Sequence, residues 1–188
     1  EKTTCACIVG TRPEVIKMAP VIRALRRSAW AQPFVIATGQ QDCLLDRALD
    51  DFRIIPDHSI PYDPKGASLV PVLTAIASRL DDLFDRIKPD FVVAQGDTTS
   101  VFAASLAAFY RRIPFIHIEA GLRTGDLSAP FPEEFHRRAV AVSTTLHCAP
   151  TGAAVSNLLN EGVSEDRILM SGNTVIDALM ETARDNPA

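Results

Sequence analysis

Apolar and polar positions alternate along the chain in two recurring patterns. Short continuous apolar runs are each followed by a stretch in which apolar residues recur at spacings of three and four. The clearest such stretch extends from Leu69 to Ile87 and stops before Pro89, which is typical of an amphipathic helix. Strands are predicted at 4–9, 34–38, 91–94, 115–118, 146–149 and 168–171, and helices at 13–27, 44–52, 69–87, 100–110, 133–143, 153–160 and 174–183.

Strands that alternate with helices indicate crossover units and a parallel sheet covered on both faces. The strands are continuous apolar runs, as burial on both faces requires. The fold class predicted is therefore α/β, a doubly wound parallel sheet of the Rossmann-like kind. Two loops interrupt the alternation: 54–66, rich in Pro and Asp and with room for a short strand, and 121–132.

Composition narrows the function classes. A chain of 188 residues with 47% apolar and 22% charged residues is an ordinary globular protein. Its net charge of −4 argues against nucleic acid or an anionic membrane as a partner. No apolar run is long enough to cross a bilayer and no signal-peptide pattern opens the chain. Cys5 and Cys7 lie in the first apolar run, where buried free thiols are expected, so a reducing cytoplasm fits.

Charged residues collect directly after three of the predicted strands. The segments concerned are Gly10 to Glu14, Gln95 to Thr99 and Glu119 to Arg123. Ligands of open parallel sheets bind outside the carboxyl ends of the strands, so these segments are expected to converge on one cleft. Arg12 and Lys17 near a helix start suit a phosphate. Several carboxylates beside an anionic ligand suggest proton transfer.

Each of these residues also has a structural alternative. Asp97 is suited to a helix N-cap, Glu119 could pair only with Arg123, and Arg12 with Lys17 could form a solvated face. The first loop lacks the three spaced glycines of a dinucleotide fingerprint, so a nicotinamide cofactor is not supported. No metal site is predicted, because no tight His and carboxylate spacing occurs.

A further charged cluster, "FPEEFHRR" at 131–138, follows the long loop. Glu133 and Glu134 at the predicted helix start suit the helix dipole, which is a structural role. Helical spacing places Glu133, Arg137 and Val140 on one face. That face could direct a carboxylate and a guanidinium into the cleft.

Taken together, the motifs "GTRPEVIKMAPVI", "QGDTTSVFAASLAAFY", "HIEAGLRTGDLSAPFPEE" and "SGNTVIDAL" resemble the non-hydrolysing UDP-N-acetylglucosamine 2-epimerase family. The resemblance implies a glycosyltransferase-B-like fold of two Rossmann-like domains around one active site. It implies interconversion of UDP-GlcNAc and UDP-ManNAc through loss of the C2 proton, elimination of UDP, a 2-acetamidoglucal intermediate and re-addition of UDP. No cofactor is consumed, and the family is linked to cell-surface polysaccharide biosynthesis.

The family's functional residues carry over by motif position. Lys17 and Arg12 would contact the nucleotide sugar, and Arg137 would be a further substrate contact. The acid–base carboxylates would be Asp97, Glu119 and Glu133.

The resemblance also sets expectations about organisation. Residues 1–188 correspond to the N-terminal, catalytic domain, and the UDP-binding second domain would lie in a C-terminal continuation or on a partner chain. The isolated chain is therefore expected to be inactive, and the complete protein a homodimer. Gln40 is a possible contact for a second, activating UDP-GlcNAc. The stretch "TGQQDC" departs from the family's pattern there at Gln41, Asp42 and Cys43, and His136 stands where Asn is expected.

Two other functions remain open from the sequence. The chain could be a nucleotide-sugar binding or regulatory module without activity, or half of a glycosyltransferase. Fold alone does not separate these classes. The three carboxylates favour the epimerase over the transferase.

Overall fold

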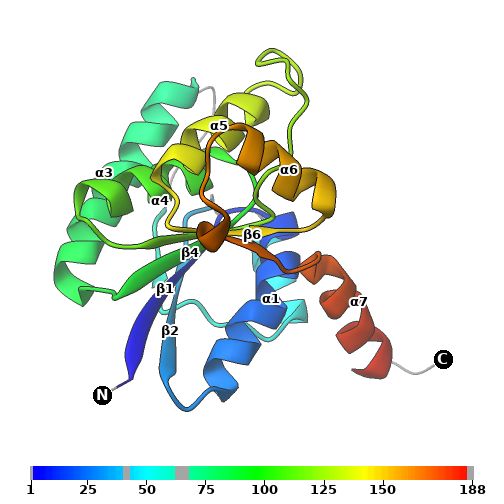
Figure 1. The fold of residues 1–188 in the computed structure, drawn as a ribbon. Helices are drawn as coiled ribbons and strands as arrows, with labels where there is room; N and C mark the ends of the chain where they lie inside the picture. Colours follow the sequence, from blue (N-terminus) through cyan, green and yellow to red (C-terminus); the bar gives the residue numbers. More distant parts are fainter. Residues whose placement is uncertain (1, 40–42, 62–67, 186–188) are drawn as a thin grey trace.

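The computed structural model describes residues 2–39, 43–61 and 68–185. They form a parallel sheet with the strand order β3-β2-β1-β4-β5-β6-β7, covered by helices on both faces (Figure 1), which confirms the predicted doubly wound architecture. The strands are β1 Thr3–Val9, β2 Ala31–Ala37, β3 His58–Ser59, β4 Phe91–Gln95, β5 Phe115–Ile118, β6 Leu146–Ala149 and β7 Ile168–Met170. The helices are α1 Arg12–Arg27, α2 Cys43–Asp51, α3 Leu69–Ile87, α4 Thr99–Tyr110, α5 Glu133–Ser143, α6 Gly152–Asn160 and α7 Thr174–Asp185.

The two faces of the sheet follow from the period-two alternation of the strands. In β1, Cys5 and Cys7 point to the core shared with α1 and α2, whereas Ala6 and Ile8 point to the core shared with α3 and α4. Cys5 and Cys7 are fully buried free thiols, as predicted. Both faces of the central strands are buried under helices, which is why these segments are apolar without interruption.

The strand order reverses between β1 and β4. β2 and β3 lie on one side of β1, and β5, β6 and β7 lie beyond β4. The loops that leave β1 and β4 at their carboxyl ends diverge to opposite faces of the sheet, because α1 covers one face and α4 the other. This divergence opens a crevice at the switch point, where ligands of such folds bind.

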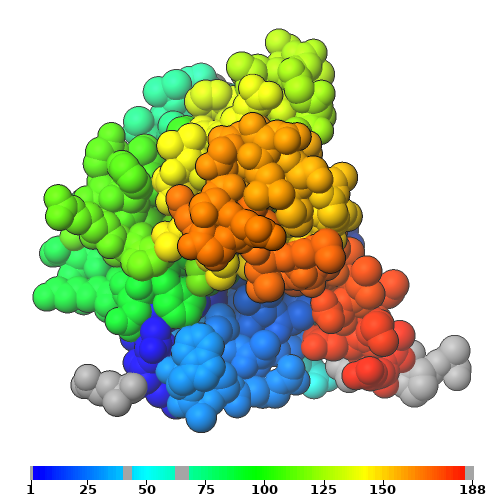
Figure 2. All heavy atoms as spheres, in the orientation of Figure 1, coloured from blue at the N-terminus to red at the C-terminus, as the bar shows by residue number. Residues whose placement is uncertain are grey.

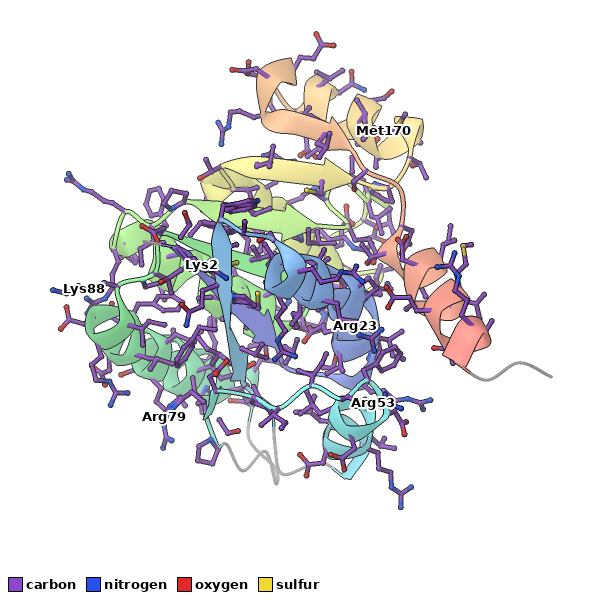
Figure 3. The ribbon with its side chains drawn as sticks, turned by 90° about the horizontal axis from the view of Figure 1, so that it is seen from below. Lys2, Arg23, Arg53, Arg79, Lys88 and Met170 are labelled. Atoms are coloured by element: carbon purple, nitrogen blue, oxygen red, sulfur yellow. The ribbon has the colours of Figure 1, made fainter. Side chains whose placement is uncertain are left out.

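The last helix, α7, returns to the α1 face of the sheet and packs against α1. Arg23 of α1 forms an ion pair with Glu181 of α7 and lies over the ring of Phe52. Figure 2 shows α7, in red, on the outside of the molecule next to the blue N-terminal part, and Figure 3 shows Arg23 between the two helices. No helix in the described ranges is both long and apolar enough to span a membrane.

Two histidines lie side by side in the buried sheet. His117 of β5 is paired in register with His147 of β6, and the two residues are 2% and 0% exposed. Nδ1 of His117 and both ring nitrogens of His147 have no hydrogen-bond partner among the described residues. Burial lowers the pKa of each from the ordinary value of 6.5 to about 4, so both are neutral at neutral pH.

These histidines are expected to make the fold sensitive to acid. Between pH 6.5 and 4 the unfolded chain binds protons that the folded chain does not, so the unfolding free energy falls as the pH falls through this window. Each histidine contributes at most about 1.4 kcal/mol per pH unit. Urea unfolding of the wild type and of His147→Gln between pH 7 and pH 4.5 measures the difference in slope. The partly exposed His58→Gln is the control, and an unchanged slope in His147→Gln would contradict the prediction.

Candidate active site

A cavity of about 310 Å³ lies at the switch point, between the ends of β1, β4 and β5. All three segments that the sequence placed at strand ends contribute to it, and α5 closes one side. Its lining residues are Thr11, Pro13, Glu14, Lys17, Gln95, Gly96, Asp97, Thr98, Glu119, Leu122 and Arg137.

The loop from β1 to α1 approaches the α4 side of the cavity closely at Gly10. A Cβ atom at this position would lie 2.3 Å from Oγ of Ser100 and 2.9 Å from Oγ1 of Thr38, so a side chain cannot be accommodated without displacing its neighbours. Pro13 lies in the first turn of α1, where its missing N–H costs no hydrogen bond. Lys17, one turn further along α1, then reaches into the cavity.

Glu119 follows β5 directly and has a left-handed backbone, with φ at 65°. Its Oε2 accepts hydrogen bonds from Nζ of Lys17 at 2.5 Å and from Nε2 of Gln95 at 2.6 Å. Only 22% of the Lys17 side chain and 14% of the Glu119 side chain are exposed. The alternative partner considered for Glu119 is wrong, because Arg123 pairs with Glu161 instead.

Asp97 is held by Arg137 of α5. Nε and Nη2 of Arg137 lie 2.8 Å and 2.7 Å from Oδ2 of Asp97. The N-cap alternative for Asp97 is wrong, because Thr98 is the N-cap of α4 and accepts a hydrogen bond from the backbone N–H of Val101. Asp97 therefore keeps its carboxylate for the cavity.

His136 of α5 contacts the backbone of the loop that carries Asp97. Its ring is 5% exposed, stacks on Phe102 at 5.3 Å and has Nδ1 2.8 Å from the backbone oxygen of Asp97. The unexpected histidine at this position thus holds the backbone on which Asp97 lies.

Glu134 anchors the long loop 121–132. It is fully buried and accepts backbone hydrogen bonds from Thr124 at 3.1 Å and Gly125 at 3.2 Å. Burial acts to raise its pKa, but these hydrogen bonds and the nearby guanidinium of Arg137 outweigh burial, so the pKa lies below its usual value. Glu134 also lies 3.4 Å from Nη1 of Arg137 and thereby orients the partner of Asp97.

The structure brings Lys17, Asp97, Glu119 and Arg137 together in the cavity, but not every candidate. Glu133 and Arg12 are not among the lining residues: Glu133 is half-buried at the start of α5, and Arg12 is exposed in the first turn of α1.

The possible second-site residue Gln40 lies outside the described residues, as do Gln41 and Asp42. Cys43 begins α2, and its side chain is likewise not described.

Among the lining residues that were not predicted as site residues, Glu14, Gln95 and Thr98 form side-chain hydrogen bonds with other lining residues. Gln95 is the last residue of β4 and Thr98 follows three residues later, so their position at the end of a strand was the available signal. Glu14 lies between two residues that were selected, Arg12 and Lys17, and a carboxylate in the first turn of a helix whose start suits a phosphate was the signal there.

Comparisons with known proteins agree with one another. A profile of the family described as UDP-N-acetylglucosamine 2-epimerase matches residues 23–187. The chain is 45% identical to the UDP-N-acetylglucosamine 2-epimerase of Bacillus subtilis over 185 residues, covering 98% of this chain and 49% of that protein.

Solved structures are similar over nearly the whole chain. The UDP-GlcNAc 2-epimerase from Neisseria meningitidis bound to UDP-GlcNAc matches with a TM-score of 0.93 at 45% identity, over 97% of this chain and 50% of that one. Another crystal structure of a UDP-N-acetylglucosamine 2-epimerase matches with a TM-score of 0.95 at 45% identity, over 100% of this chain and 53% of that one.

The chain thus spans about half the length of the relatives it matches. Its sheet has the Rossmann-like architecture of one half of a glycosyltransferase-B-like fold. The strand order, the cavity at the switch point and the family profile lead to one assignment: the chain belongs to the UDP-N-acetylglucosamine 2-epimerase family.

Proposed function

We propose that this chain forms the acid–base half of a site that interconverts UDP-GlcNAc and UDP-ManNAc. The observation that carries the proposal is the cavity in which two carboxylates, on Asp97 and Glu119, lie with two cations, on Lys17 and Arg137. Relatives are named UDP-N-acetylglucosamine 2-epimerases, and one solved relative is bound to UDP-GlcNAc. Carboxylates can move protons, and cations can hold a diphosphate.

The proposed reaction needs both kinds of group. A base takes the C2 proton, the electrons of the C2–H bond form the C1–C2 double bond, and the C1–O bond breaks with its electrons on the departing UDP. Re-addition of UDP to the resulting 2-acetamidoglucal, with a proton delivered to the opposite face of C2, gives the epimer. Asp97, Glu119 and Glu133 are the proposed acid–base groups.

The cations have a separate proposed role. Lys17, Arg137 and Arg12 bind the nucleotide sugar, and they stabilise the negative charge that develops on the diphosphate as it leaves. In the free chain, Lys17 and Arg137 are paired with Glu119 and Asp97. A phosphate entering the cavity would compete for these cations and so release the carboxylates for proton transfer.

A second domain is part of the proposal, with residues 1–188 as the N-terminal catalytic domain. The relatives are about twice as long as this chain. Exposed apolar side chains also cover the outside of β7 and α7: Leu169, Met170, Val175, Ile176, Leu179 and Met180. Their exposure supports packing of a C-terminal domain or partner chain near this end, and the complete protein is proposed to be a homodimer. Buried free thiols at Cys5, Cys7 and Cys148 support a cytoplasmic location.

The test is conversion of UDP-GlcNAc followed by NMR in D₂O. The full-length protein is expected to produce UDP-ManNAc with deuterium at C2, because the abstracted proton exchanges with solvent. The isolated chain 1–188 is expected to be inactive, because an open cleft neither positions UDP nor excludes water.

Other outcomes reject parts of the proposal. Turnover by chain 1–188 alone would mean that the second domain is dispensable. UDP-GlcNAc binding without turnover by the full-length protein would favour a binding or regulatory module. Transfer of the sugar to an added acceptor would favour a glycosyltransferase.

A further inference from the structure

Glu14 is a buried carboxyl group in the cavity that the proposed reaction does not use. Its side chain is at the cavity wall although the residue is only 2% exposed. Oε2 accepts the backbone N–H of Gly10 at 2.5 Å and that of Thr11 at 2.9 Å, and Oε1 lies 2.5 Å from Oγ1 of Thr98. Glu14 therefore joins the β1–α1 loop to the β4–α4 loop.

Glu14 also caps the start of α1, because its side chain accepts the backbone N–H of the N-cap residue Thr11. In many Rossmann-like folds, backbone N–H groups at the start of the first helix bind a phosphate. Here the N–H groups of Gly10 and Thr11 are already bonded to Glu14. These two N–H groups are therefore not available to an incoming diphosphate while Glu14 holds them.

The charges of the cavity oppose an anionic ligand. Within the described part of the chain, its lining includes three carboxylates, on Glu14, Asp97 and Glu119, but two cations, on Lys17 and Arg137. Both cations are already paired with carboxylates. With every group ionised the cavity carries a net negative charge, so entry of a diphosphate is favoured if one carboxylate becomes neutral.

Glu14 is the carboxyl group best placed to become neutral, because Thr98 can form a hydrogen bond with both its ionised and its protonated form. A hydroxyl group both donates and accepts hydrogen bonds. Thr98 can donate to the ionised carboxylate, or accept a proton donated by Oε1 of the protonated acid, while Oε2 keeps both backbone hydrogen bonds. Asp97 and Glu119, by contrast, are bonded to cations.

The surroundings of Glu14 also favour its neutral form. Burial raises its pKa to about 7, although hydrogen bonds from Thr98, Gly10 and Thr11 act to lower it, and the charge of Asp97 raises it further. The other charged groups of the cavity come from α1 (Lys17), the end of β5 (Glu119) and α5 (Arg137).

We propose that Glu14 takes up one proton when a nucleoside diphosphate sugar enters the cavity, so that ligand binding and protonation of Glu14 are coupled. The proton comes from solvent and forms the Oε1–H bond. The protonated Oε1 then donates a hydrogen bond to Oγ1 of Thr98, and no other covalent bond in the protein changes. The ligand class rests on the proposed function.

The first experiment needs no ligand. The side-chain carboxyl carbon of Glu14 is followed by NMR in chain 1–188 between pH 4 and pH 9, and the signal is assigned by its loss in Glu14→Gln. We expect a titration midpoint near pH 7. A midpoint below about pH 5, close to that of an ordinary glutamate, would overturn the inference.

The second experiment measures coupling in the full-length protein with UDP-GlcNAc, whose diphosphate stays ionised throughout this range. In the wild type, the affinity for UDP-GlcNAc is expected to fall as the pH rises. The fall reaches about tenfold per pH unit between the pKa of Glu14 in the free protein and its higher pKa in the complex. Glu14→Gln mimics the protonated acid, since its amide N–H can donate to Thr98, so its affinity should lose this pH dependence. The exposed Glu165→Gln is the matched control and should retain it.

The outcomes separate this inference from the proposed function. A wild-type pH dependence in Glu14→Gln would assign the proton to another group and overturn the inference, whatever the reaction. Coupling through Glu14 in a protein that does not epimerise UDP-GlcNAc would reject the proposed reaction alone.

Discussion

Replacing Glu119 by glutamine is expected to lower the rate of UDP-GlcNAc epimerisation by about 10²–10⁴-fold, the usual contribution of a general acid or base. Glutamine keeps the size of the side chain but cannot accept a proton from C2. Its oxygen can still accept one hydrogen bond from Lys17 or Gln95, which both contact Oε2 of Glu119. The loss should therefore appear in kcat more than in the affinity for UDP-GlcNAc.

The measurement is the NMR assay in D₂O on the full-length protein, with deuterium at C2 recorded separately from formation of the epimer. Glu165→Gln, on an exposed turn, is the control and should keep full activity. Circular dichroism and urea unfolding of Glu119→Gln exclude a folding defect. Wild-type turnover and deuterium exchange in folded Glu119→Gln would remove Glu119 from the reaction.

Replacing Gly121 by alanine is expected to destabilise the fold by about 2–5 kcal/mol, from a left-handed backbone and from overpacking together. Gly121 has φ at +86°, and a Cβ atom there would lie 2.4 Å from the backbone oxygen of Ala154 in α6. Backbone atoms of a helix cannot move aside as the end of a side chain can. Because Gly121 lies two residues after Glu119, the strain should also displace that carboxylate.

Gly125→Ala is the matched control in the same loop. Gly125 has φ at +83°, but apart from its chain neighbours no atom of the described residues lies within 4 Å of the position of its Cβ. Its replacement should cost only the conformational part, about 1–2 kcal/mol. Urea unfolding of both variants compares the two losses, and equal losses would show that contact with α6 does not restrict position 121.

The sequence predicted most of the helices and strands, and the edge of the sheet that carries the candidate site. Continuous apolar runs identified buried parallel strands, and the predicted bounds of β5, α5 and β6 agree with the structure residue for residue. Since carboxyl ends of parallel strands meet at one edge, Asp97 and Glu119 could be placed together without knowing any contact. Family motifs then supplied the chemistry, and the family itself is confirmed.

Only the tertiary structure decided which charges meet. Local spacing offered Arg123 as the partner of Glu119, but the partner is Lys17, 102 residues earlier. That pairing depends on how far apart α1 and β5 lie across the switch point, a distance that no local pattern encodes.

The rotation of α5 about its axis was likewise undetermined. One residue along a helix changes direction by about 100°. Val140 and His136 are buried, and this orientation of α5 turns Glu134, rather than Glu133, into the interior, where it accepts hydrogen bonds from the loop 121–132.

Glu14 shows the same division between sequence and structure. Its position in a charged segment after the first strand was visible in the sequence, but its burial was not. The approach of the β1–α1 loop to Thr98, 84 residues later, encloses the carboxyl group and removes it from water. Secondary structure and the location of the candidate site follow from local patterns of polarity. Ion pairs, the burial of charged side chains and their pKa values follow instead from distances between elements, which packing determines.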